Sequence, residues 1–343
     1  MKSVLIGFAI FIGADAFAGD WTKFPSLPDK EGFAGPFAGI SNGSLLVAGG
    51  ANFPDKKPWE GGKKVWYDSV FVLENPSGKW KIAGKLARPL GYGISVTHGN
   101  GVVCVGGSDA DRHYADAFRL ECKDGKLITT ALPSLPQPLA NACGAMVGDF
   151  LYVAGGQERP DSKSALKSAW MIDLSMATPK WKIIDACPGD GRILAIAAGF
   201  NDAFWVAGGT NLVAGNSGTV ERRYLKDAYR YDPGKGWKRI ADLPHPVVAA
   251  PSPAPTDATG FYLLGGDDGS QVGTVPSEHR GFTKQVVRYD LKAEKWVHSG
   301  EIPAPRVTVP CVPWNDAWVV PSGETRPGIR SPEVWALISR KKK

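Results

Sequence analysis

The stretch Leu45–Gly50, LLVAGG, has related copies along the whole of this 343-residue chain. The copies are VVCVGG at 102–107, LYVAGG at 151–156, FWVAGG at 204–209, YLLGG at 262–266 and a degenerate AWVVPSG at 317–323. Successive copies are spaced by 57, 49, 53, 57 and 57 residues. Short apolar runs that end in a Gly pair at a period of about 50 residues predict one small β-sheet per repeat and a ring of such sheets.

A second marker, a tryptophan followed six residues later by an apolar residue, runs in phase with the Gly pairs. The marked pairs are Trp80 with Leu86, Trp181 with Cys187, Trp237 with Leu243, Trp296 with Ile302 and, near the N-terminus, Trp21 with Leu27. In the second repeat Thr129 replaces the tryptophan. The repeats are typical of kelch propellers, and we predict an all-β, six-bladed kelch-type β-propeller. Its N- and C-terminal strands pair in one blade, which leaves no open edge in the ring.

The repeat indicates a single domain, and the N-terminus indicates an exported protein. Hydrophobic residues make up 43% of the chain and charged residues 22%, and the repeat predicts a single propeller domain over 19–343. Residues 1–18 resemble a signal peptide, with Lys2 before the apolar stretch Val4–Ile12 and a small-residue cleavage site at Ala16–Ala18. That stretch is too short to span a membrane, and we expect a periplasmic protein without a membrane span.

Net charge bears on the kind of ligand, and cysteine usage bears on disulfides and metal sites. A formal net charge of +6 favours anionic ligands, and no nucleic-acid-binding motif is present. The five cysteines are an odd number, so at least one is free or pairs between chains. The sequence does not decide whether Cys104 and Cys122 form a disulfide. No cysteine has the spacing of a metal site, and we expect neither a metal nor another cofactor.

Each blade should have four strands, as in 246–250, 261–264, 285–290 and 295–300 of the fifth repeat. The Gly pair would end the second strand and open a loop at the mouth of the central channel. The first residues of these loops are mostly polar, as a ring that lines a ligand would be: Ala51, Ser108, Gln157, Thr210, Asp267 and Glu324. Long loops at 51–67, 210–226 and 267–284 are further candidates for function.

Arginines recur near the start of several blades, at Arg88, Arg192 and Arg306. Arginines around a channel could bind a carboxylate in bidentate fashion, and they could equally bind backbone carbonyls between blades. We take Arg88 and Arg306 as candidate substrate-binding residues. Asn52 and Asp267, in the first and fifth loops, are two more candidates for contact with a substrate.

Two segments resemble the N-acetylneuraminate epimerases, the sialic acid mutarotases. One is GPFAGISN at 35–42 followed by SLLVAGGA at 44–51, and the other is GETRPGIR at 323–330. In the bacterial epimerase the second kind of segment precedes the first, so this chain resembles a cyclically permuted member of that family. A ring tolerates such a permutation because a moved chain break preserves every contact between blades.

The resemblance implies roles for two residues. The family's proposed catalytic base, a glutamate, matches Glu324, and an arginine six residues later matches Arg330. Pro327-Gly328 suits the centre of a type II turn, which would fold Arg330 back toward Glu324. The implied activity is interconversion of the α and β anomers of N-acetylneuraminate, an acidic sugar, by acid–base ring opening and closure. Arg330 would hold the sugar carboxylate, with Arg88 or Arg306 as helpers.

A second interpretation is a non-catalytic kelch propeller that binds a glycan or a protein, since one fold hosts many activities. A hydrolytic sialidase is a third, but the repeated S-x-D-x-G-x-T-W boxes typical of sialidases are absent from the sequence. A copper oxidase would need histidine ligands, and the five histidines have no suggestive spacing.

Overall fold

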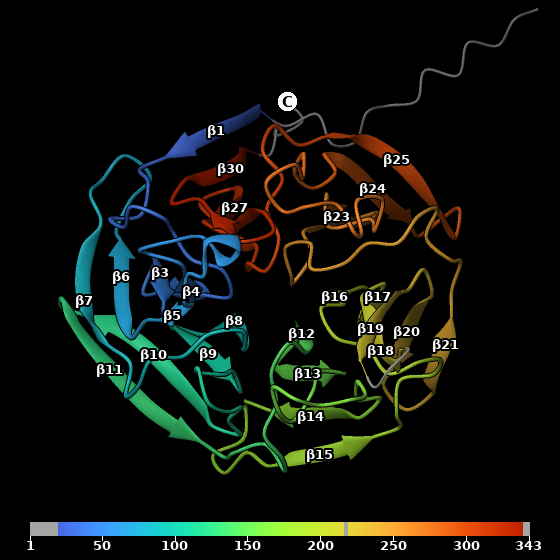
Figure 1. Cartoon of the computed structure of the whole chain (residues 1–343). Helices are drawn as coiled ribbons and strands as arrows, with labels where there is room; N and C mark the ends of the chain where they lie inside the picture. The colour runs from blue at the N-terminus through green and yellow to red at the C-terminus, as the bar shows by residue number, and fades with distance from the viewer. Residues whose placement is uncertain (1–19, 216–218, 339–343) are drawn as a thin grey trace, which may run out of the picture.

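Six four-stranded antiparallel sheets surround a central channel in the computed structural model, which describes residues 20–215 and 219–338 (Figure 1). Blade 1 consists of β2 (Phe37–Ser41), β3 (Ser44–Ala48), β6 (Ser69–Leu73) and β7 (Lys81–Lys85). Blade 2 consists of β8 (Ile94–His98), β9 (Gly101–Val105), β10 (Ala117–Lys123) and β11 (Lys126–Leu132). Blade 3 consists of β12 (Cys143–Val147), β13 (Phe150–Ala154), β14 (Ala169–Asp173) and β15 (Trp181–Ile184).

The other three blades complete the ring. Blade 4 consists of β16 (Ile196–Phe200), β17 (Ala203–Ala207), β20 (Ala228–Asp232) and β21 (Gly236–Arg239). Blade 5 consists of β22 (Thr256–Asp257), β23 (Gly260–Leu264), β24 (Gln285–Asp290) and β25 (Lys295–Glu301). Blade 6 consists of β26 (Val312–Trp314), β27 (Ala317–Pro321), β30 (Val334–Ile338) and β1 (Asp20–Phe24). The predicted six-bladed propeller is confirmed, and so is its closure, because β1 pairs with β30 along five residues (Figure 1).

Three short hairpins and one turn of 3-10 helix stand on the loops between second and third strands. The hairpins are β4 (Ala51–Asn52) with β5 (Val65–Trp66), β18 (Thr210–Ala214) with β19 (Val220–Tyr224), and β28 (Glu324–Arg326) with β29 (Ile329–Arg330). The 3-10 helix is η1 (Pro58–Glu60). Within the described parts of the chain, no helix is long and apolar enough to cross a membrane. The predicted signal peptide, residues 1–18, lies outside the described residues.

The innermost strand of blade 5 differs from the prediction. It is the two-residue β22 at Thr256–Asp257, and residues 246–250 are not a strand. These residues are apolar because Val247 and Ala250 pack into the core between blades 4 and 5. Ala249 has a φ of +57°, which an extended strand cannot accommodate.

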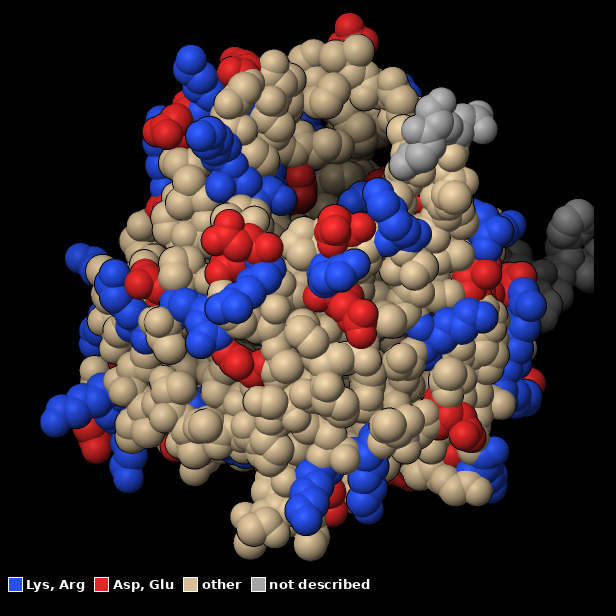
Figure 2. All heavy atoms as spheres, turned by 60° about the horizontal axis from the view of Figure 1, so that its bottom comes forward, with Lys and Arg blue, Asp and Glu red and all other residues tan. Residues whose placement is uncertain are grey.

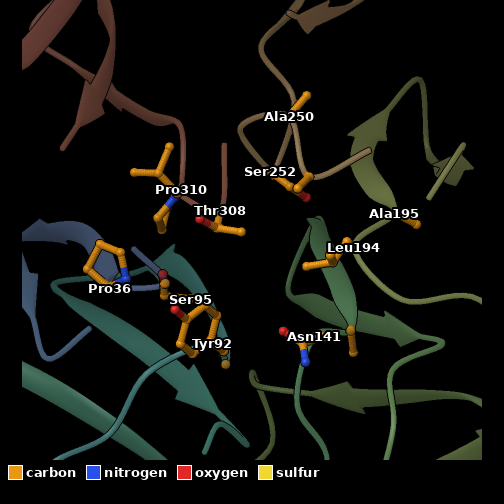
Figure 3. Close-up of a pocket in the computed structure, with 15 residues that line it drawn as sticks. Pro36, Tyr92, Ser95, Asn141, Leu194, Ala195, Ala250, Ser252, Thr308 and Pro310 are labelled. Atoms are coloured by element: carbon orange, nitrogen blue, oxygen red, sulfur yellow. The ribbon is translucent and has the colours of Figure 1, made fainter. Parts of the chain in front are cut away.

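A closed circuit of backbone hydrogen bonds encircles the channel. Its six members, one from each blade, all have φ between +53° and +64°: Gly35, Tyr92, Asn141, Leu194, Ala249 and Thr308. Each amide donates to the carbonyl of the corresponding residue in the preceding blade, at N–O distances of 2.6–2.9 Å, and Gly35 closes the circuit by donating to Thr308. We call these six the ring residues. A throat of about 70 Å³ lies beside them, with Pro36, Ser95, Ser252 and Pro310 in its wall (Figure 3).

The Gly pairs allow the blades to approach the ring closely. Gly49 has a φ of +63°, and a Cβ there would lie 2.1 Å from the carbonyl oxygen of Leu90, the atom to which the Gly50 amide donates. In the degenerate sixth copy Ser322 takes this conformation, with a φ of +80°. Its buried hydroxyl accepts a hydrogen bond from the Phe33 amide at 2.7 Å, so the side chain joins blade 6 to the start of blade 1.

The repeated tryptophans also join neighbouring blades. Their indole N–H groups donate to backbone carbonyls of the preceding segment at 2.7–2.8 Å: Trp80 to Pro25, Trp181 to Pro133, Trp237 to Asp185 and Trp296 to Ala241. Where Thr129 replaces the tryptophan, a groove of about 300 Å³ opens between blades 1 and 2, lined among others by Leu86, Phe118, Thr129 and Ala131. We call it the Thr129 groove.

All five cysteines are free. Cys104 pairs across the sheet with Phe118, not with Cys122, so the disulfide that the sequence left open is not formed. Burial raises the pKa of Cys104 well above the ordinary thiol value. The cysteines therefore act as small apolar side chains of the blades.

Candidate functional site

A cavity of about 460 Å³ opens above the ring residues, at the mouth of the channel. Figure 2 shows one face of the molecule hollowed between projecting loops, with basic and acidic side chains at the edge. Ring residues form part of the cavity wall, and the loops of blades 1, 2, 3, 4 and 6 supply the rest. Its lining includes the side chains of Phe53, Lys64, Trp66, Tyr92, Asp109, His113, Asn141, Arg222, Glu324 and Arg330.

The first residue after each Gly pair lies at this mouth. Each one forms an isolated β-bridge with the residue immediately before a ring residue: Ala51 with Ala34, Ser108 with Gly91, Gln157 with Ala140, Thr210 with Ile193, Asp267 with Val248, and Glu324 with Val307. Of these six, Ser108, Gln157 and Glu324 line the cavity. The repeat therefore brings residues that are far apart in sequence to one rim.

The β28–β29 hairpin brings Glu324 and Arg330 together. The two residues are paired in register across the hairpin, and Gly328 in its turn has a φ of +81°. That φ is the one a type II turn requires at its third position, so the tight turn that the sequence predicted is present. Glu324 Oε1 accepts the Gly328 amide at 2.7 Å and lies 3.3 Å from Arg330 Nη1.

Arg330 is held almost entirely out of water, at 7% exposure. Its guanidinium carbon lies 4.8 Å from the ring centroid of Phe53, in cation–π contact. Nε and Nη1 make no hydrogen bond within the described residues, although Nη1 is close to the carboxylate. Nε and Nη1 are closed to solvent, so an anionic ligand would use these unpaired donors after a small shift of the guanidinium.

Two further ionisable groups line the blade 2 side of the cavity. His113 is buried, and its Nδ1 lies 3.0 Å from the carbonyl oxygen of Gln157, which requires the proton on Nδ1. Burial lowers the pKa of His113, so the ring is neutral at pH 7 and its Nε2 is an acceptor. Asp109 accepts hydrogen bonds from the Tyr114 hydroxyl and from the amides of Asp111 and Arg112 at 2.9 Å each.

The arginines predicted to help Arg330 lie elsewhere. Arg88 stacks on Tyr114 and pairs with Asp116 beside the Thr129 groove, between blades 1 and 2. Arg306 is buried at 4% exposure and pairs with Glu333 at 2.7 Å. Neither lines the mouth cavity. Both have structural partners, as in the alternative interpretation, but these partners are carboxylates and not the backbone carbonyls between blades that it named.

Arg192 behaves in the same way. It is 1% exposed, donates to the Gly208 carbonyl at 3.0 Å and pairs with Asp227 at 2.8 Å. In each of the three pairs the acidic partner stands directly before the third strand of a blade: Asp116 before β10, Asp227 before β20 and Glu333 before β30. The recurrence of arginine in the sequence thus reflects a repeated structural pair.

The two remaining candidates also have structural partners. Asn52 is 1% exposed; its amide donates to Gly32 O at 2.9 Å and its Oδ1 accepts the Tyr67 hydroxyl at 2.8 Å. Asp267 accepts the Tyr224 hydroxyl at 2.7 Å, and burial together with this carboxylate raises the pKa of Tyr224. Neither side chain lines the cavity.

Several lining residues were not predicted as site residues, namely Lys64, Asp109, His113 and Arg222. They come from three loops, of which those at 51–67 and 210–226 were candidates by their length, and no periodic pattern marks the individual residues. The position after each Gly pair is the signal that could have found their neighbours, since it names Ser108 and Gln157 as well as Glu324. Among residues 20–215 and 219–338, no group of three or more histidine, cysteine, aspartate or glutamate side chains could hold a metal ion.

Comparison with known proteins finds a similar family for about a third of the chain. Residues 11–129 match the sequence model of a family described as N-acetylneuraminate epimerase. This part of the chain is similar to the N-acetylneuraminate epimerases. The proteins of that name from Salmonella enteritidis and Salmonella typhimurium are 40% identical to this chain over 124 aligned residues, and the one from Haemophilus influenzae is 37% identical over 123 residues.

Each of these alignments covers 32% of this chain and 32% of the epimerase, so the chain matches about a third of the length of its relatives. The matched stretch holds blade 1, much of blade 2 and the cavity side chains Phe53, Lys64, Tyr92 and His113. Glu324 and Arg330 lie outside it.

Proposed function

We propose that this protein is a sugar mutarotase that interconverts the α and β anomers of N-acetylneuraminate. The observation that carries the proposal is the Glu324–Arg330 pair in the wall of the mouth cavity. The family that matches residues 11–129 and the curated relatives of the chain carry the name N-acetylneuraminate epimerase, which supports the proposal. We further propose that the chain is a cyclically permuted relative of these epimerases and acts in the periplasm.

The reaction needs one group that takes a proton and returns it. Glu324 uses Oε1 to accept the Gly328 amide, and Oε2 has no hydrogen-bond partner among the described residues. In the proposed reaction this oxygen removes the proton of the anomeric hydroxyl. The bond between the anomeric carbon and the ring oxygen breaks, and the protonated Glu324 returns this proton to the ring oxygen. After rotation of the open-chain ketone, the same steps in reverse close the ring on the other face.

Arg330 would position the substrate. Sialic acid carries a carboxylate on its anomeric carbon, and Nε and Nη1 of Arg330 are donors without hydrogen-bond partners. A carboxylate bound there would place the anomeric hydroxyl beside Glu324, because Arg330 Nη1 and Glu324 Oε1 are only 3.3 Å apart. Binding energy for the carboxylate is thereby coupled to the orientation of the reacting hydroxyl.

Anomeric exchange by proton NMR tests the proposal. The α anomer is released with a sialidase, and its equilibration is followed with and without wild-type protein and the Glu324→Gln variant. The variant keeps an oxygen for the Gly328 amide but cannot take a proton, so we expect it to lose about 10²–10⁴-fold in rate. The proposal fails if the wild type does not accelerate exchange, and the assignment of Glu324 fails if both proteins accelerate it equally.

A parallel binding measurement separates the enzyme from a binding module. Saturation-transfer NMR reports whether the sugar contacts the protein. Binding by both proteins without acceleration by the wild type would favour the non-catalytic alternative, in which the mouth cavity only recognises a glycan.

A further inference from the structure

The cavity contains a lysine held by aromatic rings. The ammonium of Lys64 lies 5.1 Å from the ring centroid of Tyr92, 5.3 Å from that of Trp66 and 5.9 Å from that of Phe53. All four side chains line the cavity. Aromatic faces attract a cation, so the three rings fix the ammonium at the cavity wall instead of leaving it to reach into solvent.

The loop that carries Lys64 is itself anchored. Its ends pair as β4 with β5, where Asn52 pairs with Val65. Its middle contains η1, and Lys57 just before η1 forms an ion pair with Glu31. The ammonium is therefore positioned by both local packing and a tied loop, which reduces the entropy lost when a ligand binds.

The charges around the cavity leave Lys64 uncompensated. Arg330 lies 3.3 Å from Glu324, so that pair is neutral as a unit. Asp109, held by the Tyr114 hydroxyl and two amides, keeps its negative charge, and Arg222 in the same lining supplies a positive charge of equal size. Lys64 forms no salt bridge with any carboxylate of the described chain, so the lining carries one net positive charge. An anion bound by Arg330 alone would lie beside the Glu324 carboxylate, which would repel it.

A second cation on the same wall removes this difficulty. Arg330 and Lys64 both contact the ring of Phe53, at 4.8 and 5.9 Å from its centroid. We propose that Lys64 is the residue that makes the site selective for an anionic sugar, by supplying the positive charge that Glu324 cancels at Arg330. This inference rests on the proposed function, and it adds the residue that distinguishes an acidic sugar from a neutral one.

The test compares two substrates that differ in one charge: N-acetylneuraminate and its methyl ester. Anomer-exchange rates and dissociation constants are measured for wild type, Lys64→Met and Lys63→Met. Lys63 is the matched control because it is exposed and adjacent to Lys64 but does not line the cavity. Methionine keeps an unbranched apolar chain of similar length against the aromatic rings while removing the charge.

We expect Lys64→Met to lose about 10–100-fold in kcat/KM for the acid, as for loss of a charged contact, and less than about threefold for the ester. Lys63→Met should stay within about twofold of wild type for both. Raising the salt concentration should slow wild type on the acid more than it slows Lys64→Met.

Two results would overturn the inference. Equal losses for acid and ester would show that Lys64 acts through packing, and no loss for either would show that it plays no part. If wild type accelerates neither substrate, the proposed function fails, and the binding constants then decide the inference: Lys64→Met must weaken binding of the acid but not of the ester.

Discussion

The Thr129 groove predicts a stabilising substitution. In four other blades a tryptophan at the equivalent position lies between neighbouring sheets and donates its indole N–H to a backbone carbonyl. Replacing Thr129 with tryptophan would place an indole in the groove of about 300 Å³ against Leu86 and Phe118. By the register of the repeat, the equivalent backbone acceptor is the carbonyl of Gly84.

The magnitude follows from burial. Covering roughly 100 Å² of the indole at about 25 cal/mol per Å² contributes about 2.5 kcal/mol. Ordering the side chain costs about 1 kcal/mol, and a new hydrogen bond adds about 1 kcal/mol where its geometry is good. We therefore expect Thr129→Trp to raise the free energy of unfolding by about 2 kcal/mol and the unfolding midpoint by about 2–4 °C.

The assay is thermal and urea unfolding followed by far-UV circular dichroism, at one scan rate for all proteins because large rings commonly unfold irreversibly. The matched control is Thr130→Trp. Thr130 is exposed, neighbours Thr129 on the same strand and points to the other face of the sheet, so it should give no gain. A Thr129→Trp protein no more stable than Thr130→Trp would refute the argument that the groove is an unfilled tryptophan position.

Two further predictions concern the blade seams and the closure. Gly49→Ala should lower the free energy of unfolding by at least about 3 kcal/mol, because its Cβ would lie 2.1 Å from Leu90 O. The control is Gly43→Ala, at φ +80° in open space, which should lower it by only about 1 kcal/mol. Urea titration measures both. Hydrogen bonding from Lys23 lowers the pKa of Glu333, so this carboxylate stabilises the fold above its ordinary value of 4.5 and loses that effect as the pH falls through the lowered value. Glu333→Gln should therefore flatten the acid limb of a urea-midpoint profile, and an unchanged limb would exclude this carboxylate as a cause of acid unfolding.

Much of the fold was predictable because every blade uses the same contacts with its neighbours, and the residues that make them recur in the sequence. The Gly pairs mark places where a Cβ would collide with the next loop, as at Gly49, and the tryptophans mark hydrogen bonds between blades. The closure by β1 followed from Trp21, since its repeat partner was missing at the other end of the chain. The inner strand of blade 5 was not predictable, because two residues carry no periodicity and the buried segment around Ala249 is as apolar as a strand.

The site was predictable only where local geometry determines it. Pro327-Gly328 turns the chain, so the approach of Arg330 to Glu324 could be expected from seven consecutive residues. The arginine candidates illustrate the opposite case. An arginine recurs at the repeat position of Arg306 because it pairs with the acidic residue before a third strand. Only the structure distinguishes such a pair from a ligand site. The position of Lys64 depends on contacts with three aromatic rings from two blades. No spacing in the sequence predicts these contacts.

The hydrogen-bond circuit of the ring residues has an electrostatic consequence. Its six hydrogen bonds run head to tail around the axis, and each amide from Gly35 to Thr308 points to the carbonyl of the preceding ring residue. Dipoles that circulate in a closed loop sum to almost nothing, unlike those of a helix, which add along one direction. The components of these dipoles in the plane of the ring therefore cancel. The charged side chains of the rim, among them Lys64, Glu324 and Arg330, then dominate the field that a ligand meets at the mouth, and replacing a few of them would change the sign of that field while leaving the hydrogen-bonded ring in place.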